Sequence, residues 1–449
     1  MTDAWTVAPA TVWDRIRANY TQWVLFIGIG AFLPFSYFVA SATTPLIVLI
    51  GIFLLGHLKS LKVFWPVAAL TAMMLILAFI RSDFVDMLRH GESLKQASHD
   101  SKMYFRAPML MWAAIWAVVC AGYNLSEAQS RRVFKWFGLT MLILTGLLAA
   151  EALSHFGLRD AINRMWFKGA RPEMVVVRVS DSNFVLLFLF WPLTFYFMAR
   201  RWLAAVVAMA LVIVALAVVV DTNAQVLALV VSGIAFAAAK YWPRNLSGRG
   251  VTPERLLAAL VGLFILTFPF VMLWLARSGL AVKLKPHVGL SWAARLDIWS
   301  FAAQKGAEKP WSGWGFESAR LFVPIIPNHP HNLALQAWLE LGVPGLVLLA
   351  MLWFAIFWCM APRGEAQAAE APSGGFVELT AIGTAREVEA GSVVQQARPY
   401  IIGLAVTYFV VNAISFGIWR DWLYTLGAFA AAMSLIAIKA VSEGKRLQF

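Results

Sequence analysis

The segment PHNLALQAWLELGVPG, from Pro330 to Gly345, contains residue types that could transfer a proton. His331 and Asn332 stand directly before an apolar stretch, and Gly342 and Gly345 follow it. A histidine at the rim of a membrane helix can accept or release a proton near neutral pH, at the depth where lipid phosphates lie. His331 is therefore a candidate general base.

The residues after His331 predict a short helix that begins at Asn332 and is broken by Gly342 and Pro344. His331 is then expected at a helix N-terminus, where the partial positive charge lowers the imidazole pKa and favours the neutral, basic form. His331 is preferred to His329 because it directly precedes Asn332. The alternative is a loop histidine that is only solvated or capping the helix.

Arg295 is the candidate anion-binding residue. The surrounding segment, LSWAARLDIWSFAAQK, predicts an amphipathic helix at the membrane interface, with Ser291 as its N-cap. The apolar positions that recur at helical spacing are Trp292, Leu296, Trp299 and Ala303. A guanidinium held between Trp292 and Trp299 stays charged and could bind a pyrophosphate through two hydrogen bonds. The alternative is an interfacial arginine with no ligand.

The elements that must position these residues are membrane helices. Of the 449 residues, 61% are hydrophobic and 14% charged, whereas soluble domains are roughly half apolar and a quarter charged. We therefore predict an all-α integral membrane protein with about twelve spans. The predicted spans are 23–41, 44–56, 63–80, 107–121, 135–152, 184–199, 202–219, 225–239, 255–276, 337–360, 399–417 and 422–438.

Basic residues in alternate short connections predict the orientation, because such residues stay on the cytoplasmic side. They place the N-terminus inside and the long loops 81–106, 153–183 and 277–332 outside. The expected organisation is then a cytoplasmic tail (1–22), a membrane body of about nine helices (23–276), a periplasmic catalytic loop (277–336), one span (337–360), a flexible cytoplasmic loop (361–398) and the last two spans with a tail (399–449). The outer loops nevertheless carry many arginines and lysines, which favours contact with anionic phosphates.

Other chemistry has little support in the sequence. Asp83 and Asp86 could in principle hold a metal, but an isolated acidic pair is usually solvated, so we predict no metal and no cofactor. Nucleotide-binding glycine patterns and zinc-like Cys/His spacing are missing, and no nucleic-acid partner is expected. Cys120 and Cys359 fall inside predicted spans and are expected to be packing residues.

Residues 290–360 resemble the O-antigen ligase and polymerase superfamily. The resemblance rests on Arg295 with Trp299, on Pro310 with Gly313-Trp314-Gly315, on His331-Asn332 and on the supporting glycines Gly342 and Gly345. It implies a C-type membrane glycosyltransferase that acts on the periplasmic face of the bacterial inner membrane with an undecaprenyl pyrophosphate donor.

One feature departs from the resemblance. Many relatives carry an arginine in a Ser-Arg pair after a mid-chain helix, whereas this chain has Asp221-Thr-Asn-Ala-Gln225 at the corresponding outer turn. Arg171 or Arg178, in the segment RPEMVVVRVSDSN, could supply the missing contact to the donor pyrophosphate. The sequence does not choose between them.

Within the superfamily we expect an O-antigen ligase, which transfers the glycan to lipid A-core with inversion and without a metal. An O-antigen polymerase and an O-linked protein oligosaccharyltransferase share the same motif and remain alternatives. A transporter or flippase is a different possibility. It is disfavoured because the predicted span interiors are almost free of charge, whereas transporters carry ionisable groups at mid-membrane.

Overall fold

The computed structural model describes residues 19–82, 99–166, 172–362 and 385–442. Within these ranges the chain is all-α and contains no strand, as predicted. The α-helices are α2 (Tyr20–Phe38), α3 (Thr43–Phe53), α4 (Trp65–Ile80), α6 (His99–Asn124), α7 (Glu127–Leu153), α8 (Gly157–Trp166), α9 (Pro172–Ala199), α10 (Leu203–Val219), α11 (Asn223–Lys240), α12 (Arg244–Gly248), α13 (Pro253–Arg277), α14 (Leu280–Leu284), α15 (Leu290–Glu308), α16 (Leu333–Met360), α18 (Ala385–Ile414) and α19 (Asp421–Ser442). Short 3-10 helices are η1 (Ala40–Ala42), η2 (Leu55–Phe64), η3 (Lys285–His287) and η4 (Ser318–Phe322).

The helices have the length and composition of a multi-pass membrane protein. Among the described residues, nine helices are long and apolar enough to cross a bilayer, and three shorter apolar helices accompany them. Each of the twelve predicted apolar runs falls on one of these helices, although several helices begin earlier than predicted. The prediction of an all-α membrane protein is therefore confirmed, whereas twelve full spans are not established.

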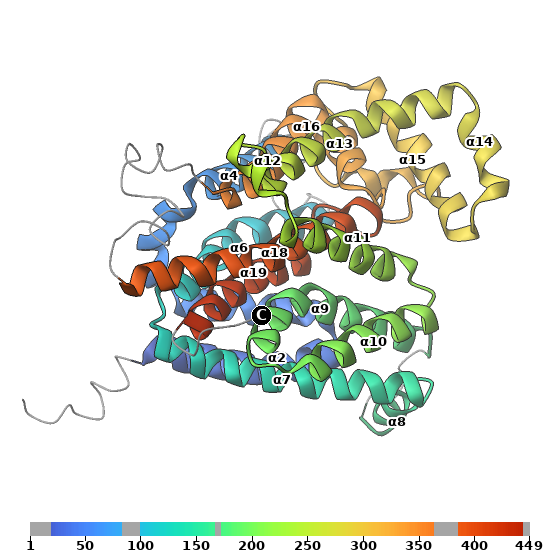
Figure 1. Cartoon of the computed structure of the whole chain (residues 1–449). Helices are drawn as coiled ribbons and strands as arrows, with labels where there is room; N and C mark the ends of the chain where they lie inside the picture. Colours follow the sequence, from blue (N-terminus) through green and yellow to red (C-terminus); the bar gives the residue numbers. More distant parts are fainter. Residues whose placement is uncertain (1–18, 83–98, 167–171, 363–384, 443–449) are drawn as a thin grey trace, which may run out of the picture.

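Most of the long helices run side by side and form a bundle with two ends (Figure 1). At one end, Arg398 of α18 pairs with Glu254 of α13 at 2.5 Å. At the other end, where α16 begins and α18 stops, the side chain of Arg295 donates to the carbonyl of Ile414. The start of α18 therefore lies at the same end as the start of α13, and its last turn lies at the end where α16 begins. The orientation of the chain in the membrane stays a prediction.

The bundle interior is built by helices that are distant in sequence. α19 packs against α6, α7 and α9, while α13 packs along α16 and α11 packs along α18. Local sequence sets where several helices begin: Ser126 and Gln129 form a capping box before α7, and Thr252 accepts a hydrogen bond from Arg255 N–H before α13.

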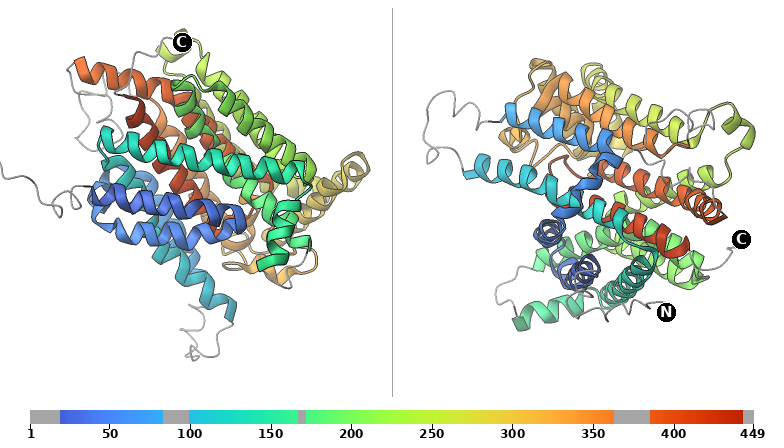
Figure 2. Two further views of the ribbon diagram at one scale, coloured as in Figure 1. Left: turned by 90° about the horizontal axis from the view of Figure 1, so that it is seen from below. Right: turned by 90° about the vertical axis from the view of Figure 1, so that its left-hand side faces the viewer.

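The segment between α13 and α16 forms a small helical unit at one end of the bundle, with α14 and α15 at the same end as α8 (Figures 1 and 2). Its core contains Trp299, Ala302 and Ala303 of α15, packed against Leu335 and Leu339 of α16. A helix over this segment was therefore predicted correctly, with Trp299 and Ala303 on its buried face. Its place at the membrane interface stays a prediction. Its predicted N-cap was wrong.

The residue at the cap of α15 is Gly289, and Ser291 lies within the first turn. The hydroxyl of Ser291 instead accepts a hydrogen bond from Arg295 Nη1 at 2.6 Å. The loop predicted over 361–398 also needs correction, because α18 already begins at Ala385. Residues 363–384 lie outside the described part of the chain.

Candidate functional site

The site is organised by the start of α16. Asn332 is the N-cap, and its Oδ1 accepts a hydrogen bond from Leu335 N–H at 2.9 Å. Its Nδ2 donates to the carbonyl of Ala413 at 2.8 Å, so the same fully buried side chain ties α16 to the end of α18. Asn332 therefore fixes the position of the residue before it, His331.

The ring of His331 is held by a backbone carbonyl. His331 Nδ1 lies 2.7 Å from the carbonyl oxygen of Ser415, in the connection between α18 and α19. A carbonyl oxygen can only accept a hydrogen bond, so Nδ1 carries the proton in the neutral ring. The other nitrogen, Nε2, then has a free lone pair and is the basic atom.

His331 has a left-handed backbone, with φ of 55°, which is uncommon for a residue other than glycine. Its N–H donates to Nδ1 of His329 at 3.2 Å, and the two rings lie 4.3 Å apart between centroids. Two hydrogen bonds therefore hold His331 in this conformation, one from its backbone N–H to His329 and one from its ring to Ser415. His329 uses its Nδ1 atom for this structural contact.

Both histidines are biased toward the neutral form. Burial is the largest cause of the lowered pKa of His331, and the charges of Arg295 and Arg420 lower it further, against the hydrogen bond to Ser415. Burial, followed by the nearby His331, lowers the pKa of His329 to about 2. The predicted direction of the pKa shift of His331 agrees with the structure, and burial is its largest cause.

Arg295 belongs to the surroundings of His331, because its charge acts on the His331 ring. Its guanidinium carbon is 5.1 Å from the centre of the Trp292 ring, and its Nε donates to the carbonyl of Ile414 at 3.0 Å. Nη1 contacts Ser291, and Nη2 has no partner among the described residues. Burial lowers the pKa of Arg295, yet a guanidinium remains charged at any physiological pH. Arg295 is therefore a positioned cation whose Nη2 group can donate a hydrogen bond to a ligand.

Arg420 is a second cation of the site that the sequence did not single out. Its charge acts on both His331 and His329, and on Asp181 of α9. Within the described residues its guanidinium has no hydrogen-bond or ion-pair partner, and it is only partly exposed. The available signal was its place in a short outer turn between two late spans. Sequence alone could not place that turn beside His331.

The two arginines predicted as helpers have different outcomes. Arg171 lies outside the described residues. Arg178 lies in α9, one helical turn before Asp181, and its charge acts on Arg159. No contact or charge interaction joins Arg178 to His331 in the described chain, so its role in the site is not tested by the geometry.

The mid-chain turn that departs from the resemblance has a packing role. Gln225 is fully buried and accepts a hydrogen bond from Asn183 Nδ2 at 2.6 Å, while its own Nε2 donates to the carbonyl of Ser180 at 3.0 Å. The side chain at this position thus joins α11 to α9. It is not available as an anion ligand.

The glycine motifs complete the frame around α16. Gly342 has a non-helical backbone (φ 68°, ψ −160°) that breaks the helix, and a Cβ there would lie 2.6 Å from the carbonyl oxygen of Pro310. The break frees the carbonyls of Leu339 and Glu340, which accept hydrogen bonds from the N–H groups of Trp314 and Gly315 at 2.8 and 3.0 Å. The Gly313-Trp314-Gly315 segment therefore packs against α16 and bonds to the backbone carbonyls just before its break at Gly342.

The second glycine of the later pair, Gly345, packs against the turn before the break. A Cβ at Gly345 would lie 2.2 Å from Cβ of Leu341. Both positions thus need glycine for space. Their predicted part as structural support for the histidine motif is consistent with these contacts.

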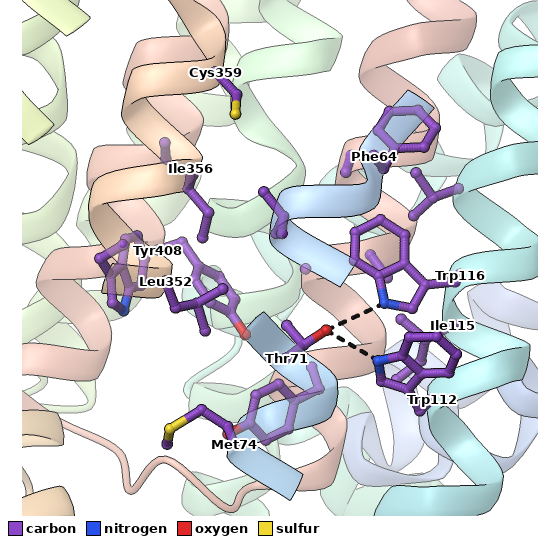
Figure 3. A pocket seen from close by; sticks show the side chains of 18 of the residues that line it. Phe64, Thr71, Met74, Trp112, Ile115, Trp116, Leu352, Ile356, Cys359 and Tyr408 are labelled. Atoms are coloured by element: carbon purple, nitrogen blue, oxygen red, sulfur yellow. Dashed lines mark hydrogen bonds between the residues drawn. The ribbon is translucent and has the colours of Figure 1, made fainter. Parts of the chain in front are cut away.

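A cavity of about 430 Å³ runs beside the site, among α4, α6, α16, α18 and α19. Its walls are mainly apolar, with Leu352, Ile356 and Tyr408 facing Thr71, which accepts hydrogen bonds from the indoles of Trp112 and Trp116 at 3.0 and 3.4 Å (Figure 3). On α19 the lining extends from Asp421 to Ile438, a helical rise of about 25 Å. The Asp421 end directly follows Arg420.

One buried carboxylate was also missed. Glu340 is fully buried in α16, two turns after Asn332. The signal was present in the sequence, because a glutamate inside an apolar run is unusual and marks a functional hypothesis.

The described residues offer no cluster of three or more His, Cys, Asp or Glu side chains suited to a metal. Asp83 and Asp86 lie outside the described residues. Cys120 is buried and Cys359 is half-buried at the cavity wall, and neither forms a disulfide within the described residues.

Comparison with known proteins agrees with this architecture. Residues 218–350 match the family described as O-Antigen ligase, a range that contains Arg295, His331, Asn332, Gly342 and Gly345 but not Arg420. Curated proteins named as candidate polysaccharide ligases are similar: those of Rickettsia felis and Rickettsia conorii are 26% and 25% identical over 162 and 161 residues, 33% of this chain and 32% of each relative. That of Rickettsia bellii is 29% identical over 173 residues, 35% of each chain.

The matches span about a third of the length of these curated relatives. They fall on a chain whose described part is a multi-pass helical bundle. Residues 218–350 are thus similar to the O-Antigen ligase family, and about a third of the chain is similar to proteins named as candidate polysaccharide ligases.

Proposed function

We propose that this protein is an O-antigen ligase that transfers a glycan from undecaprenyl pyrophosphate to a hydroxyl group of lipid A-core, on the periplasmic face of the bacterial inner membrane. The observation that carries the proposal is the pairing of a histidine of fixed tautomer with two guanidiniums. His331 has its proton on Nδ1, directed at Ser415, and the charges of Arg295 and Arg420 both act on its ring.

In the proposed reaction, Nε2 of His331 takes the proton of the acceptor hydroxyl while that oxygen attacks the anomeric carbon. The new bond joins the acceptor oxygen to this carbon, and the bond from the carbon to the phosphate oxygen breaks. The electron pair leaves with undecaprenyl pyrophosphate, so a single displacement inverts the anomeric configuration. His331 then returns its proton to solvent.

The negative charge that grows on the departing pyrophosphate needs compensation. Arg295 and Arg420 supply it as fixed cations in a partly desolvated site, where such charges act more strongly than in water. Arg171 or Arg178 can contribute further positive charge to the same donor. No divalent metal is required in this scheme.

The cavity supports a lipid-linked donor. In such a donor the pyrophosphate is attached directly to the polyprenyl tail, so the tail must begin close to the reacting carbon. The apolar cavity begins beside Arg420 and extends down α19 for about the depth of most of the hydrocarbon core. The acceptor does not share this constraint, because core sugars separate its hydroxyl from its acyl chains.

Reconstitution of the purified protein in liposomes tests the proposal and separates the alternatives. The liposomes contain undecaprenyl pyrophosphate-linked glycan and excess EDTA, with lipid A-core, a second donor glycan or a hydroxyl-bearing protein as acceptor. A ligase should glycosylate lipid A-core and produce the inverted anomer. Transfer only to the second glycan would identify a polymerase, and transfer only to protein an oligosaccharyltransferase. Activity that EDTA abolishes and Mg²⁺ or Mn²⁺ restores would reject the metal-free scheme.

A further inference from the structure

Glu340 joins three segments of the chain beneath the candidate site. Its Oε1 accepts a hydrogen bond from Gln336 Nε2 at 3.0 Å. Its Oε2 accepts from the indole of Trp419 at 2.5 Å and from the backbone N–H of Glu317 at 3.2 Å. The carboxylate thus connects α16 with the segment after α15 and with the connection between α18 and α19.

That last connection, residues 415–420, is what holds and surrounds His331. Ser415 provides the carbonyl bound by His331 Nδ1, and Arg420 provides the second cation. Gln336, which is bound to Glu340, also contacts this connection, because its Oε1 accepts a hydrogen bond from Ile418 N–H at 2.8 Å. The fit is close: a Cβ added to Gly417 would lie 2.5 Å from Gln336 Oε1 and 3.0 Å from Cβ of His329.

The outermost groups of this network are N–H donors, and they fix the direction of every hydrogen bond in it. Ile418 can only donate through its backbone N–H, so the oxygen of the Gln336 amide faces it and the amide nitrogen faces Glu340. Trp419 and Glu317 also present only donors. Position 340 must therefore accept on both sides, which a carboxylate does and a single amide does not.

We propose that Glu340 is a positioning residue for His331: through Gln336 and Trp419 it holds residues 415–420 so that the Ser415 carbonyl keeps the His331 proton on Nδ1. Glu340 contacts no reacting atom in this proposal. Its effect is to leave Nε2 as the basic atom. The catalytic meaning rests on the proposed function, but the tautomer of His331 can be measured without substrate.

Glu340→Gln is the first test variant. Whichever way the new amide turns, at least one donor then faces another donor, at Gln336, Trp419 or Ile418. We expect the connection to shift, His331 to populate both tautomers, and kcat to fall about 100-fold, the loss typical of a small misplacement of reacting groups.

The double variant Gln336→Glu/Glu340→Gln is the matched rescue. It exchanges the two groups, so that the carboxylate at 336 accepts from Ile418 and from the amide at 340, whose oxygen accepts from Trp419 and Glu317. All four hydrogen bonds are restored with one of them reversed. We expect the single tautomer and most of kcat to return, whereas Gln336→Glu alone places two carboxylates together and should be impaired.

The measurement is solid-state NMR of the ¹⁵N-histidine-labelled protein in liposomes, with the His331 signals assigned by their loss in His331→Ala. Glu254→Gln is the control, because Glu254 is equally buried but pairs with Arg398 at the opposite end of the bundle. It should leave the His331 tautomer unchanged. Trp419→Phe removes one donor and should give an intermediate mixture, which provides a test if either variant at 340 does not fold.

The possible outcomes separate this inference from the proposed function. A single Nδ1–H tautomer that persists in folded Glu340→Gln would reject the positioning role, as would a folded exchange variant that stays mixed. Loss of thermal stability alone, with unchanged tautomer and kcat, would assign Glu340 to packing. If instead His331→Ala retains activity while Glu340→Gln still changes the tautomer, the positioning role stands and the catalytic role of His331 fails.

Discussion

The Nδ1 atom of His331 lies 2.7 Å from the carbonyl oxygen of Ser415, a residue 84 positions later in the chain. This contact assigns the ring proton to Nδ1 and leaves Nε2 basic. The contact also brings His331 close to both candidate cations. Arg295 donates to the carbonyl of Ile414, the residue before Ser415, and Arg420 lies five residues after Ser415.

Replacement of His331 tests the proposed base. His331→Ala should leave the protein inserted and folded while ligation falls about 100- to 10,000-fold, the usual range for loss of a general base. The rate of transfer to lipid A-core in liposomes measures the effect. His329→Ala should reduce it much less, because the hydrogen bond of His329 goes to the backbone N–H of His331 and not to its basic nitrogen, and exposed His287→Ala should have no effect. Near-normal ligation by His331→Ala would remove this residue from the mechanism.

The second prediction uses the shape of Arg295. Its planar guanidinium spans Trp292, Ser291 and Ile414 and keeps Nη2 for a ligand, which the compact ammonium of lysine cannot reproduce. Arg295→Lys should therefore lose most of its ligation rate although the net charge is preserved. The matched control is Arg164→Lys, at a residue 74% exposed in an ion pair on α8, which should retain full activity. Equal rates for the two variants would indicate that Arg295 has only an interfacial role.

Arg420 should act on donor binding as well as on the reaction. Because its guanidinium has no partner within the described chain, Arg420→Ala removes a cation without exposing an unpaired protein group. We expect kcat/KM for the pyrophosphate donor to fall at least about tenfold, with KM for the lipid acceptor changed little. Steady-state kinetics with each substrate varied in turn measures this. An effect confined to the acceptor KM would contradict the assignment to the donor.

The pH dependence follows from the lowered pKa of His331. The neutral ring is the base, so kcat/KM should rise with pH as the Nε2 atom of His331 loses its proton. Above the pKa of His331 it should stay level. Burial and the two arginines place this point below the ordinary value of 6.5. Ligation should thus exceed half of its maximum at pH 6.5 and fall below half only in more acidic buffer. An acid limb centred above pH 6.5 would be inconsistent with this environment.

The cavity predicts a dependence on the length of the donor tail. Ile356→Trp places a large ring in the cavity, far from the reacting groups, and should raise KM for the undecaprenyl donor about tenfold while a short-chain prenyl donor is little affected. Val347→Trp is the control on the same helix, because Val347 is exposed and does not line the cavity. Equal effects on long and short donors would show that the tail binds elsewhere.

Several properties of this protein could be predicted from sequence because they depend on local patterns. The length of the apolar runs requires membrane helices, since an isolated backbone in lipid must satisfy its own hydrogen bonds. The residues of α16 predicted a helix that begins at Asn332 and a break at Gly342, and the structure has Asn332 as the N-cap and Gly342 at the break. The start of α15 was misplaced because Ser291 bonds Arg295 and does not cap the helix.

Only the tertiary structure determines the surroundings of His331 and Glu340, because segments far apart in the chain form them. The sequence could nominate His331 and Arg295, but only the packing of α16 against the end of α18 brings Ser415 and Arg420 to the same ring. The same packing turns Glu340 from an isolated acidic residue in an apolar run into the acceptor of three hydrogen bonds. The physical reason is that a tautomer, a buried charge and a cavity are properties of surroundings, and segments far apart in the chain provide those surroundings.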